Sequence, residues 1–127
     1  MSDITTRGVR VRALSQYHAE QSDPAAGYWL FTYTITLSNE GDTPVQLVSR
    51  HWVITDATGS QEHVSGLGVV GEQPRLEPGA QYQYSSGCPL PTSMGAMHGH
   101  FEMVLDDGER FEAEIAPFTL ADPMALN

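Results

Sequence analysis

The chain contains no lysine. All six of its basic residues are arginines, against 16 aspartates and glutamates, which gives 127 residues a net charge of −10. Without lysine, the chain has neither the amine of Schiff-base chemistry nor the lysine of a P-loop phosphate site. Because a strongly acidic surface repels phosphate backbones, we expect no nucleic-acid partner. The same acidity leaves the binding of a divalent cation open.

Cysteine and long apolar runs are also scarce. Cys88 is the single cysteine, so an internal disulfide is excluded. No apolar run approaches the roughly 20 residues that cross a bilayer, and the first residues lack the apolar segment of a signal peptide. We therefore expect no membrane insertion and a reducing, cytoplasmic location.

Amphipathic helices are missing too, and alternation takes their place. In residues 28–38, Phe31, Tyr33 and Ile35 share one parity while threonines occupy the other. This period of two in aromatic and β-branched residues predicts a strand with one buried face. Val9–Tyr17 alternates in the same way and is the first strand that we expect.

Residues 45–55 are apolar on both parities, since Leu47 and Trp52 lie an odd number of positions apart. A strand buried on one face only has no need of this pattern. We expect either a central strand with a bulge near Ser49 and Arg50, or a strand whose outer face is covered. Further strands are expected at residues 61–64 and 81–85, followed by a last hairpin that turns at residues 106–108.

Proline sets the expected ends of the later strands, because it cannot donate to a β-ladder. Residues 88–91 contain Pro89 and Pro91 and are expected to be irregular. Pro117 is expected to end the last strand, and residues 121–127 to fray. About seven or more short antiparallel strands with frequent turns predict an all-β sandwich, formed by residues 1–127 as one domain.

The central stretch matches the letters G-x-G-x-x-G. We consider as its binding loop Gly66, Leu67, Gly68, Val69, Val70, Gly71 and Gln73. A dinucleotide fingerprint requires a helix after the glycines, and Pro74 prevents one. Three interpretations stay open: a backbone nest for phosphate, a connection whose glycines have positive φ, and a partner-binding surface. If Gly68 has positive φ, Gly68→Ala should cost about 1–2 kcal/mol.

Two histidines suggest a metal site. His98 and His100 lie two apart, so a strand projects both from one face, with Glu102 continuing the row. Such side chains bind zinc, cobalt or nickel, but further ligands would have to come from elsewhere, for example His51 or His63. An ordinary solvated face is the alternative, and we predict weak or absent metal binding here.

Several ordered segments resemble the bacterial ApaG family, also called CorD. They are Ser49-Arg50-His51-Trp52-Val53-Ile54-Thr55-Asp56, Gly66-Leu67-Gly68-Val69-Val70-Gly71-Glu72-Gln73-Pro74, Leu76-Glu77-Pro78-Gly79 and Tyr84-Ser85-Ser86-Gly87-Cys88. The resemblance implies a fibronectin type III/immunoglobulin-like β-sandwich. It also implies kinship with domains of F-box adaptors and of a polymerase delta-interacting protein that look like interaction modules. The family is linked with cobalt resistance and magnesium efflux, and it supplies no catalytic residues and no cofactor.

Two functions from different classes remain at this point. The first is a non-enzymatic binding domain with an unidentified protein partner and no cofactor. The alternative is a protein or enzyme that binds nucleoside polyphosphate or pyrophosphate through the loop from Gly66 to Gly71. The acidic charge and the lack of a catalytic set favour the first.

Overall fold

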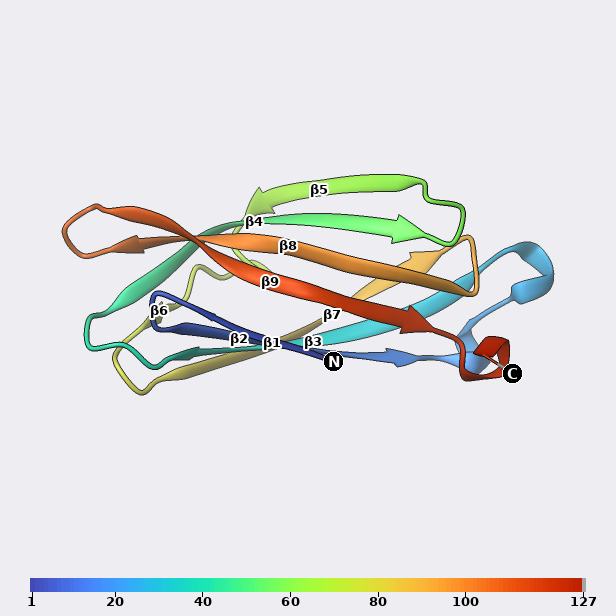
Figure 1. The fold of residues 1–127 in the computed structure, drawn as a ribbon, viewed down its shortest axis with the longest axis horizontal. Coiled ribbons are helices and arrows are strands. Elements are labelled where there is room, and N and C mark those ends of the chain that lie inside the picture. Colours follow the sequence, from blue (N-terminus) through green and yellow to red (C-terminus); the bar gives the residue numbers. More distant parts are fainter. Residues whose placement is uncertain (127) are drawn as a thin grey trace.

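The computed structural model describes residues 1–126 and consists almost entirely of strands (Figure 1). The strands are β1 (Ser2–Thr6), β2 (Val9–Tyr17), β3 (Trp29–Asn39), β4 (Val45–Asp56), β5 (Gln61–Leu67), β6 (Arg75–Leu76), β7 (Gln81–Leu90), β8 (Met94–Leu105) and β9 (Arg110–Ala121). Short 3-10 turns occupy η1 (Ala19–Gln21), η2 (Pro24–Ala26) and η3 (Pro123–Leu126). No helix among the described residues is long and apolar enough to cross a membrane.

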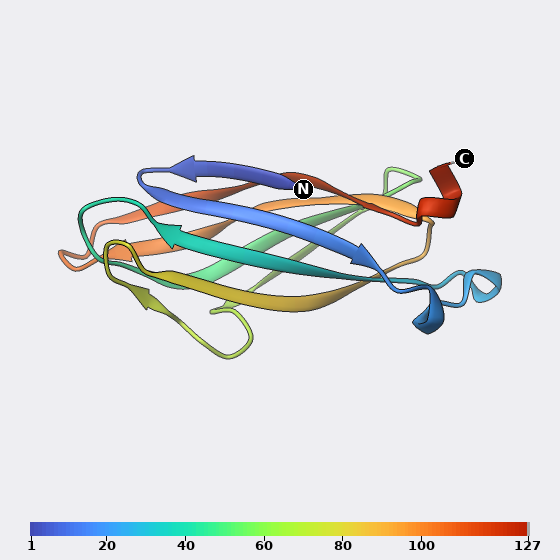
Figure 2. The same cartoon turned by 90° about the horizontal axis from the view of Figure 1, so that it is seen from below.

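The strands form two sheets that face each other. One sheet has the order β1-β2-β3-β7, and the other has the order β5-β4-β8-β9, with the short β6 also paired to β4. Neighbouring strands are antiparallel throughout these pairings. Figures 1 and 2 show the two layers from two directions. The prediction of an all-β, fibronectin type III/immunoglobulin-like sandwich is confirmed.

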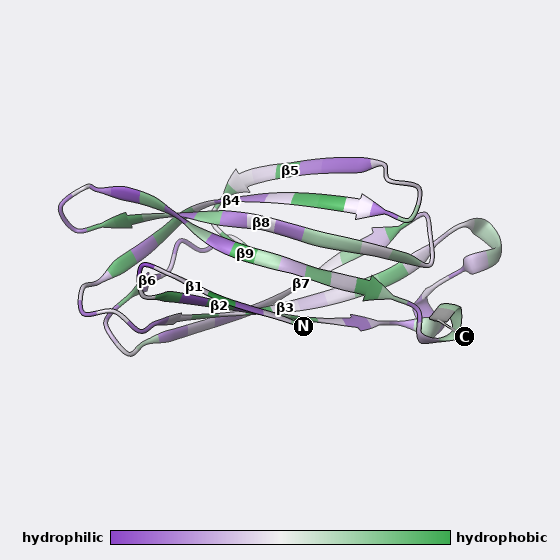
Figure 3. Ribbon diagram, in the orientation of Figure 1, coloured by the Kyte–Doolittle hydropathy of each residue, from purple (hydrophilic) through white to green (hydrophobic). Residues whose placement is uncertain are grey.

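The core lies between the two sheets and follows the alternation of the sequence. Phe31, Ile35 and Leu37 of β3 are fully buried, and Trp52 of β4 meets them from the other sheet. Its ring contacts those of Tyr33, Phe101 and Phe118. Hydrophilic and hydrophobic segments interleave along the strands (Figure 3), as expected when one face of each sheet is buried.

A bulge explains why β4 is apolar on both parities. The pairing of β4 with β8 shifts register between Leu47 and Ser49. Before the bulge Val45 and Leu47 are buried, and after it Trp52 of the other parity is buried. A bulge inserts one extra residue and so exchanges the two faces. The predicted bulge near Ser49 and Arg50 is confirmed.

Both expectations based on proline are wrong. β7 runs through Pro89 to Leu90, and β9 runs through Pro117 to Ala121. Each of these strands lies at the edge of its sheet, where one row of N–H groups has no partner strand and a missing donor costs little. The pairing of β8 with β9 also shifts register opposite Pro117, so that proline sits at an irregularity in the ladder.

Three expected boundaries also change. β1 precedes the first strand that the sequence predicts. It pairs with β2, but its mostly polar residues show no core pattern, and the alternation therefore did not reveal it. β5 extends beyond residue 64 to Leu67, so the glycine stretch begins inside a strand. In the tail that was expected to fray, Ala121 ends β9 and Pro123–Leu126 forms η3, while Asn127 lies outside the described residues.

Candidate functional site

The glycine stretch forms a loop beside β4. Both of its ends pair with that strand: Leu67 of β5 lies opposite Ser49, and Arg75 of β6 lies opposite Gln46. Residues 68–74 form the excursion between β5 and β6 and contain no helix. The yellow-green segment of Figure 2 stands out from the body of the sandwich. We call residues 66–74 the glycine loop.

The middle of the glycine loop is a tight two-residue turn. The amide N–H of Val69 donates to the carbonyl of Glu72 at 2.8 Å, and that of Glu72 donates back to Val69 at 2.9 Å. Between them, Val70 has φ +49° and Gly71 has φ +80°. Positive φ at both central residues defines a type I′ turn, whose twist suits a hairpin. The expected helix-free connection with positive-φ glycines is what the structure contains.

Each glycine of the G-x-G-x-x-G pattern has its own structural reason. A Cβ on Gly66 would lie 3.0 Å from both terminal nitrogens of the Arg50 guanidinium, which packs against it. A Cβ on Gly68, where φ is +64°, would lie 2.4 Å from the carbonyl oxygen of Glu72. Gly71 supplies the second positive φ of the turn. The pattern thus arises from packing and turn geometry, without reference to a phosphate.

Three of the N–H groups that a phosphate nest could use are bonded within the protein. The amide of Gly68 donates to the carbonyl of Val48 at 2.8 Å, and the amides of Val69 and Glu72 bond across the turn. A nest binds an anion with successive free N–H groups. With three of these amides occupied, the loop offers a poor cradle for pyrophosphate.

Side chains hold the near end of the loop against β4. Arg50 donates from Nη1 to the carbonyls of Leu67 and Gly68 at 3.1 and 2.8 Å. Gln73 donates from Nε2 to the carbonyl of Val48 at 2.9 Å, and Gln46 donates to the carbonyl of Gln73 at 3.0 Å. These bonds fix the position of the loop relative to the sheet.

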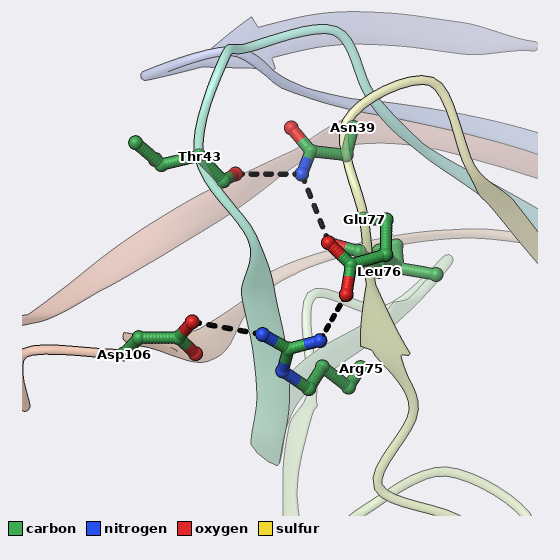
Figure 4. A network of polar contacts seen from close by, with 6 residues as sticks. All are labelled: Asn39, Thr43, Arg75, Leu76, Glu77 and Asp106. Atoms are coloured by element: carbon green, nitrogen blue, oxygen red, sulfur yellow. Dashed lines mark hydrogen bonds and ion pairs between the residues drawn. The ribbon is translucent and has the colours of Figure 1, made fainter.

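A second network holds the far end (Figure 4). The buried amide of Asn39 donates to the carbonyls of Thr43 and Leu76 at 2.8 and 3.0 Å. Arg75 pairs with Asp106 at 2.8 Å and also with Glu77. Ion pairs at such exposed positions contribute little stability, whereas a satisfied buried amide fixes the local path of the chain. The loop therefore leaves and returns at defined points.

The loop buries one valine and exposes its neighbours. Val69 is 0% exposed and anchors the turn in the core, whereas Val70 is 66% and Leu67 is 76% exposed. Val69 and Val70, both members of the predicted binding loop, therefore have different roles. Val69 is the anchor. Val70 in the turn and Leu67 at the end of β5 are exposed apolar side chains, and we call these two residues together the loop tip.

We expect Gly68→Ala to lower the free energy of unfolding by about 2 kcal/mol, because it combines positive φ with a backbone clash. Gly71→Ala is the matched control, since its φ is also positive but its Cβ would meet nothing within 4 Å. We expect that variant to lose about 1 kcal/mol. Urea unfolding of both proteins measures the difference, and equal losses would show that the approach of Glu72 to Gly68 does not matter.

The outer face of the β5-β4-β8-β9 sheet carries a row of histidines. Nδ1 of His63 and Nε2 of His51 lie 3.2 Å apart, and the rings of His51 and His100 stack with centroids 5.4 Å apart. In the middle of the row, His51 Nδ1 lies 2.6 Å from the hydroxyl of Ser65, and at one end His100 Nε2 lies 3.1 Å from a carboxylate oxygen of Glu112. The strand register places these residues side by side, which the sequence could not do.

His98 and His100 lie on one face of β8, but their neighbours differ. His98 lies opposite Val53, while His100 joins the row with His51 and Glu112. Within residues 1–126, no group of three or more histidines, cysteines or carboxylates is arranged to hold a metal ion. Weak or absent metal binding at His98 and His100 stays a prediction.

Cys88 is buried in β7. Burial, reinforced by the negative charge of Glu62, raises the pKa of the Cys88 thiol to about 11. At neutral pH the group is therefore a thiol and not the thiolate that nucleophilic catalysis requires. Its place in the hydrophobic core makes it a structural residue.

Sequence reasoning missed Arg50 as a site residue. It shares the inward parity of Trp52 and Ile54 in β4, so a charged side chain interrupts a row of core residues. An arginine at a core-parity position of a central strand is a signal that the sequence did carry. It proved to be the residue that supports the glycine loop.

Comparison with known proteins gives consistent results. The sequence pattern of the ApaG domain matches residues 19–105. Protein ApaG of Dechloromonas aromatica (strain RCB) is 50% identical over the full length of both chains, and Protein ApaG of Stenotrophomonas maltophilia is 47% identical over 127 residues. A crystal structure of a protein from Bordetella pertussis is 47% identical in sequence. The superposition includes 91% of this chain and 94% of the Bordetella chain, with a TM-score of 0.89.

Proposed function

This chain belongs to the ApaG family, and we propose that it is a non-enzymatic binding module that engages a protein partner through the loop tip. One observation carries the proposal: Val70 is exposed, apolar and strained at the same time. Leu67 adds a second exposed apolar side chain to the tip, on a loop that is held rigidly at both ends. A rigid projection loses little conformational entropy when it binds.

The strain at Val70 supports a role in contact. For an L-residue, a left-handed backbone costs roughly 1–2 kcal/mol, and a β-branched side chain is a rare occupant of it. Glycine or asparagine would form the same turn without that cost. Since Val70 is mostly exposed, its side chain recovers little of the cost by burial in its own chain. Contact with a partner explains why an apolar side chain stands there.

The proposed partner is a protein surface with an apolar depression. The net charge of −10 disfavours nucleic acid and other phosphate polymers. A location in the cytoplasm is part of the proposal, supported by a single cysteine that is buried as a thiol. The proposal also includes the link with cobalt resistance and magnesium efflux. Its support is that imidazole nitrogens are ligands of transition metals, and two of them, in His51 and His63, lie 3.2 Å apart.

We expect Val70→Asp to abolish partner binding without loss of stability. Aspartate tolerates a left-handed backbone better than valine, and the side chain is exposed. The measurement is capture of proteins from native extract by the tagged chain, quantified by mass spectrometry, with urea unfolding run in parallel. Leu14→Asp is the matched control, because Leu14 is 58% exposed on the other sheet. A partner captured equally by the wild type and by Val70→Asp would contradict the proposal.

Calorimetry tests the alternative, which is binding of nucleoside polyphosphates by the glycine loop. Because three amides of the loop bond within the protein, we expect no heat above dilution when ATP, NAD or diadenosine tetraphosphate is titrated into the chain in a calorimeter. Saturable binding of any of these that Gly68→Ala removes from a folded protein would establish the alternative.

A further inference from the structure

The two sides of the sandwich are closed differently. Along β1, β2 and β9 the sheets are joined: the Ser15 hydroxyl donates to the carbonyl of Thr119 at 2.7 Å, and the Glu114 amide donates to the hydroxyl of Thr6 at 3.2 Å. On the other side, between β4–β5 and β3–β7, a cleft of about 280 Å³ opens between the sheets. Its walls include Arg50, Trp52, Glu62, Val64, Ser86 and Met97.

Arg50 brings a positive charge into this cleft without a carboxylate beside it. No ion pair within residues 1–126 includes Arg50. Its Nη1 donates to the carbonyls of Leu67 and Gly68, which uses two of the five guanidinium N–H groups. A partly buried charge is normally paired, and this one lies unpaired in a chain with 16 acidic residues.

Two further donors near Arg50 lack acceptors. Trp52 lines the cleft and is 2% exposed, yet its indole N–H has no hydrogen-bond partner in the described part of the chain. The buried hydroxyl of Tyr84 has none either. Burial raises the pKa of Tyr84, while the nearby charge of Arg50 opposes the shift, so the phenol keeps its proton. Buried donors of this kind are usually satisfied, and a ligand oxygen in the cleft would satisfy the indole N–H of Trp52, which lines it.

The rest of the cleft has both polar and apolar walls. Val64 and Met97 line its walls, and the strand register places Glu62 opposite Ile54, four residues along β4 from Arg50. Four strand residues span about 13 Å, so the carboxylate of Glu62 and the guanidinium enter from separate positions. A ligand with one anionic end and an apolar body matches this distribution.

We propose that the cleft is a binding site for a small organic acid, with its carboxylate at Arg50 and the Trp52 indole N–H and its apolar body against Val64 and Met97. The volume lies just below the roughly 300–1,000 Å³ of typical ligand pockets, which suits a molecule of the size of benzoate. The proposal does not depend on the proposed protein partner, because the ligand is held by the walls of the cleft and not by the exposed side chains of Leu67 and Val70.

The test follows the indole N–H resonance of Trp52 in amide NMR spectra while benzoate is added, with the Trp29 indole as an internal reference. A ligand this small should bind with a dissociation constant of about 1–10 mM. Benzamide, which has the same shape without the charge, should bind at least about tenfold more weakly. Arg50→Met should weaken benzoate binding by about tenfold or more, whereas Arg12→Met, with the same change in net charge, should leave it unchanged.

Because Arg50 also supports the glycine loop, a second variant tests the other wall of the cleft. Val64→Phe should fill the cleft from β5 and remove benzoate binding while the protein stays folded. The proposal is overturned if benzoate gives no saturable shift up to about 50 mM, well above the expected affinity. It is equally overturned if benzamide binds as well as benzoate, or if Val64→Phe binds benzoate like the wild type.

Discussion

Trp52→Ala is expected to lower the free energy of unfolding by about 3–5 kcal/mol, the loss typical of a buried aromatic truncated to alanine. The indole lies at the centre of the core and meets Tyr33 edge-on at 5.1 Å between centroids and Phe118 at 6.0 Å. Its N–H has no acceptor among the described residues, so no hydrogen bond is lost with it. The whole loss should come from the ring contacts and the cavity left behind.

Phe31→Ala tests the opposite sheet and should lose a similar amount, since Phe31 is fully buried beside Tyr17. Leu14→Ala is the control for both, because an exposed leucine on β2 should change stability by no more than about 0.5 kcal/mol. Urea midpoints measure all three proteins. A midpoint unchanged in Trp52→Ala or Phe31→Ala would show that the residue lies outside the core.

Gly99→Ala is expected to lower the free energy of unfolding by about 3 kcal/mol, at the upper end of ordinary overpacking. Gly99 of β8 lies opposite Trp52 of β4, and a Cβ there would lie 2.0 Å from the carbonyl oxygen of His51. The obstacle is backbone, so no side-chain rotamer can relieve it. β4 and β8 would have to separate at the centre of their sheet.

Gly87→Ala provides a matched control within a strand. Gly87 of β7 does not have positive φ, and its Cβ would meet only the carbonyl oxygen of Phe31, at an ordinary 3.9 Å. Because alanine has less freedom than glycine in the unfolded chain, this substitution should be neutral or slightly stabilising. Equal stability of the two variants in thermal unfolding would contradict the close approach at Gly99.

The alternation of polar and apolar residues predicted the fold, because the apolar positions form the core. The pattern of Val9–Tyr17 predicted β2 at its exact bounds, and the pattern of residues 28–38 predicted β3 to within one residue at each end. The double parity of β4 predicted either a bulge or a covered outer face, and the register shift between Leu47 and Ser49 shows that the bulge is present. A period of two shows directly which side chains of a strand are buried, so it can be read without knowing which strands pair with it.

What alternation cannot supply is the position of a strand within its sheet. The sequence predicts an irregular segment around Pro89 and a strand end at Pro117, yet both residues lie inside strands because β7 and β9 are edges. Sheet order depends on contacts distant in sequence, which a local pattern does not contain. The same limit applies to the histidines, since only the register of β4, β5 and β8 brings His51, His63 and His100 together.

The glycine loop contains one feature that the sequence predicted and one that it could not predict. Pro74 excluded the dinucleotide fold from sequence alone, and in the structure the residues after Gly71 lead into β6 and not into a helix. The sequence could not separate Val69 from Val70, because adjacent letters of the same type gave no indication of which one is buried. The turn geometry decides it, since positive φ at Val70 directs its side chain away from the core that Val69 enters.

We propose that the loop tip contacts a protein partner by its shape. The most direct test is a map of backbone amide shifts when the captured partner is added to the isotope-labelled chain. We expect the largest changes at Leu67 and Val70 and at their neighbours in the glycine loop, with the outer face of β1 and β2 unaffected. Changes centred on the histidine row or on β1 and β2, with the amides of residues 66–74 unmoved, would contradict the claim.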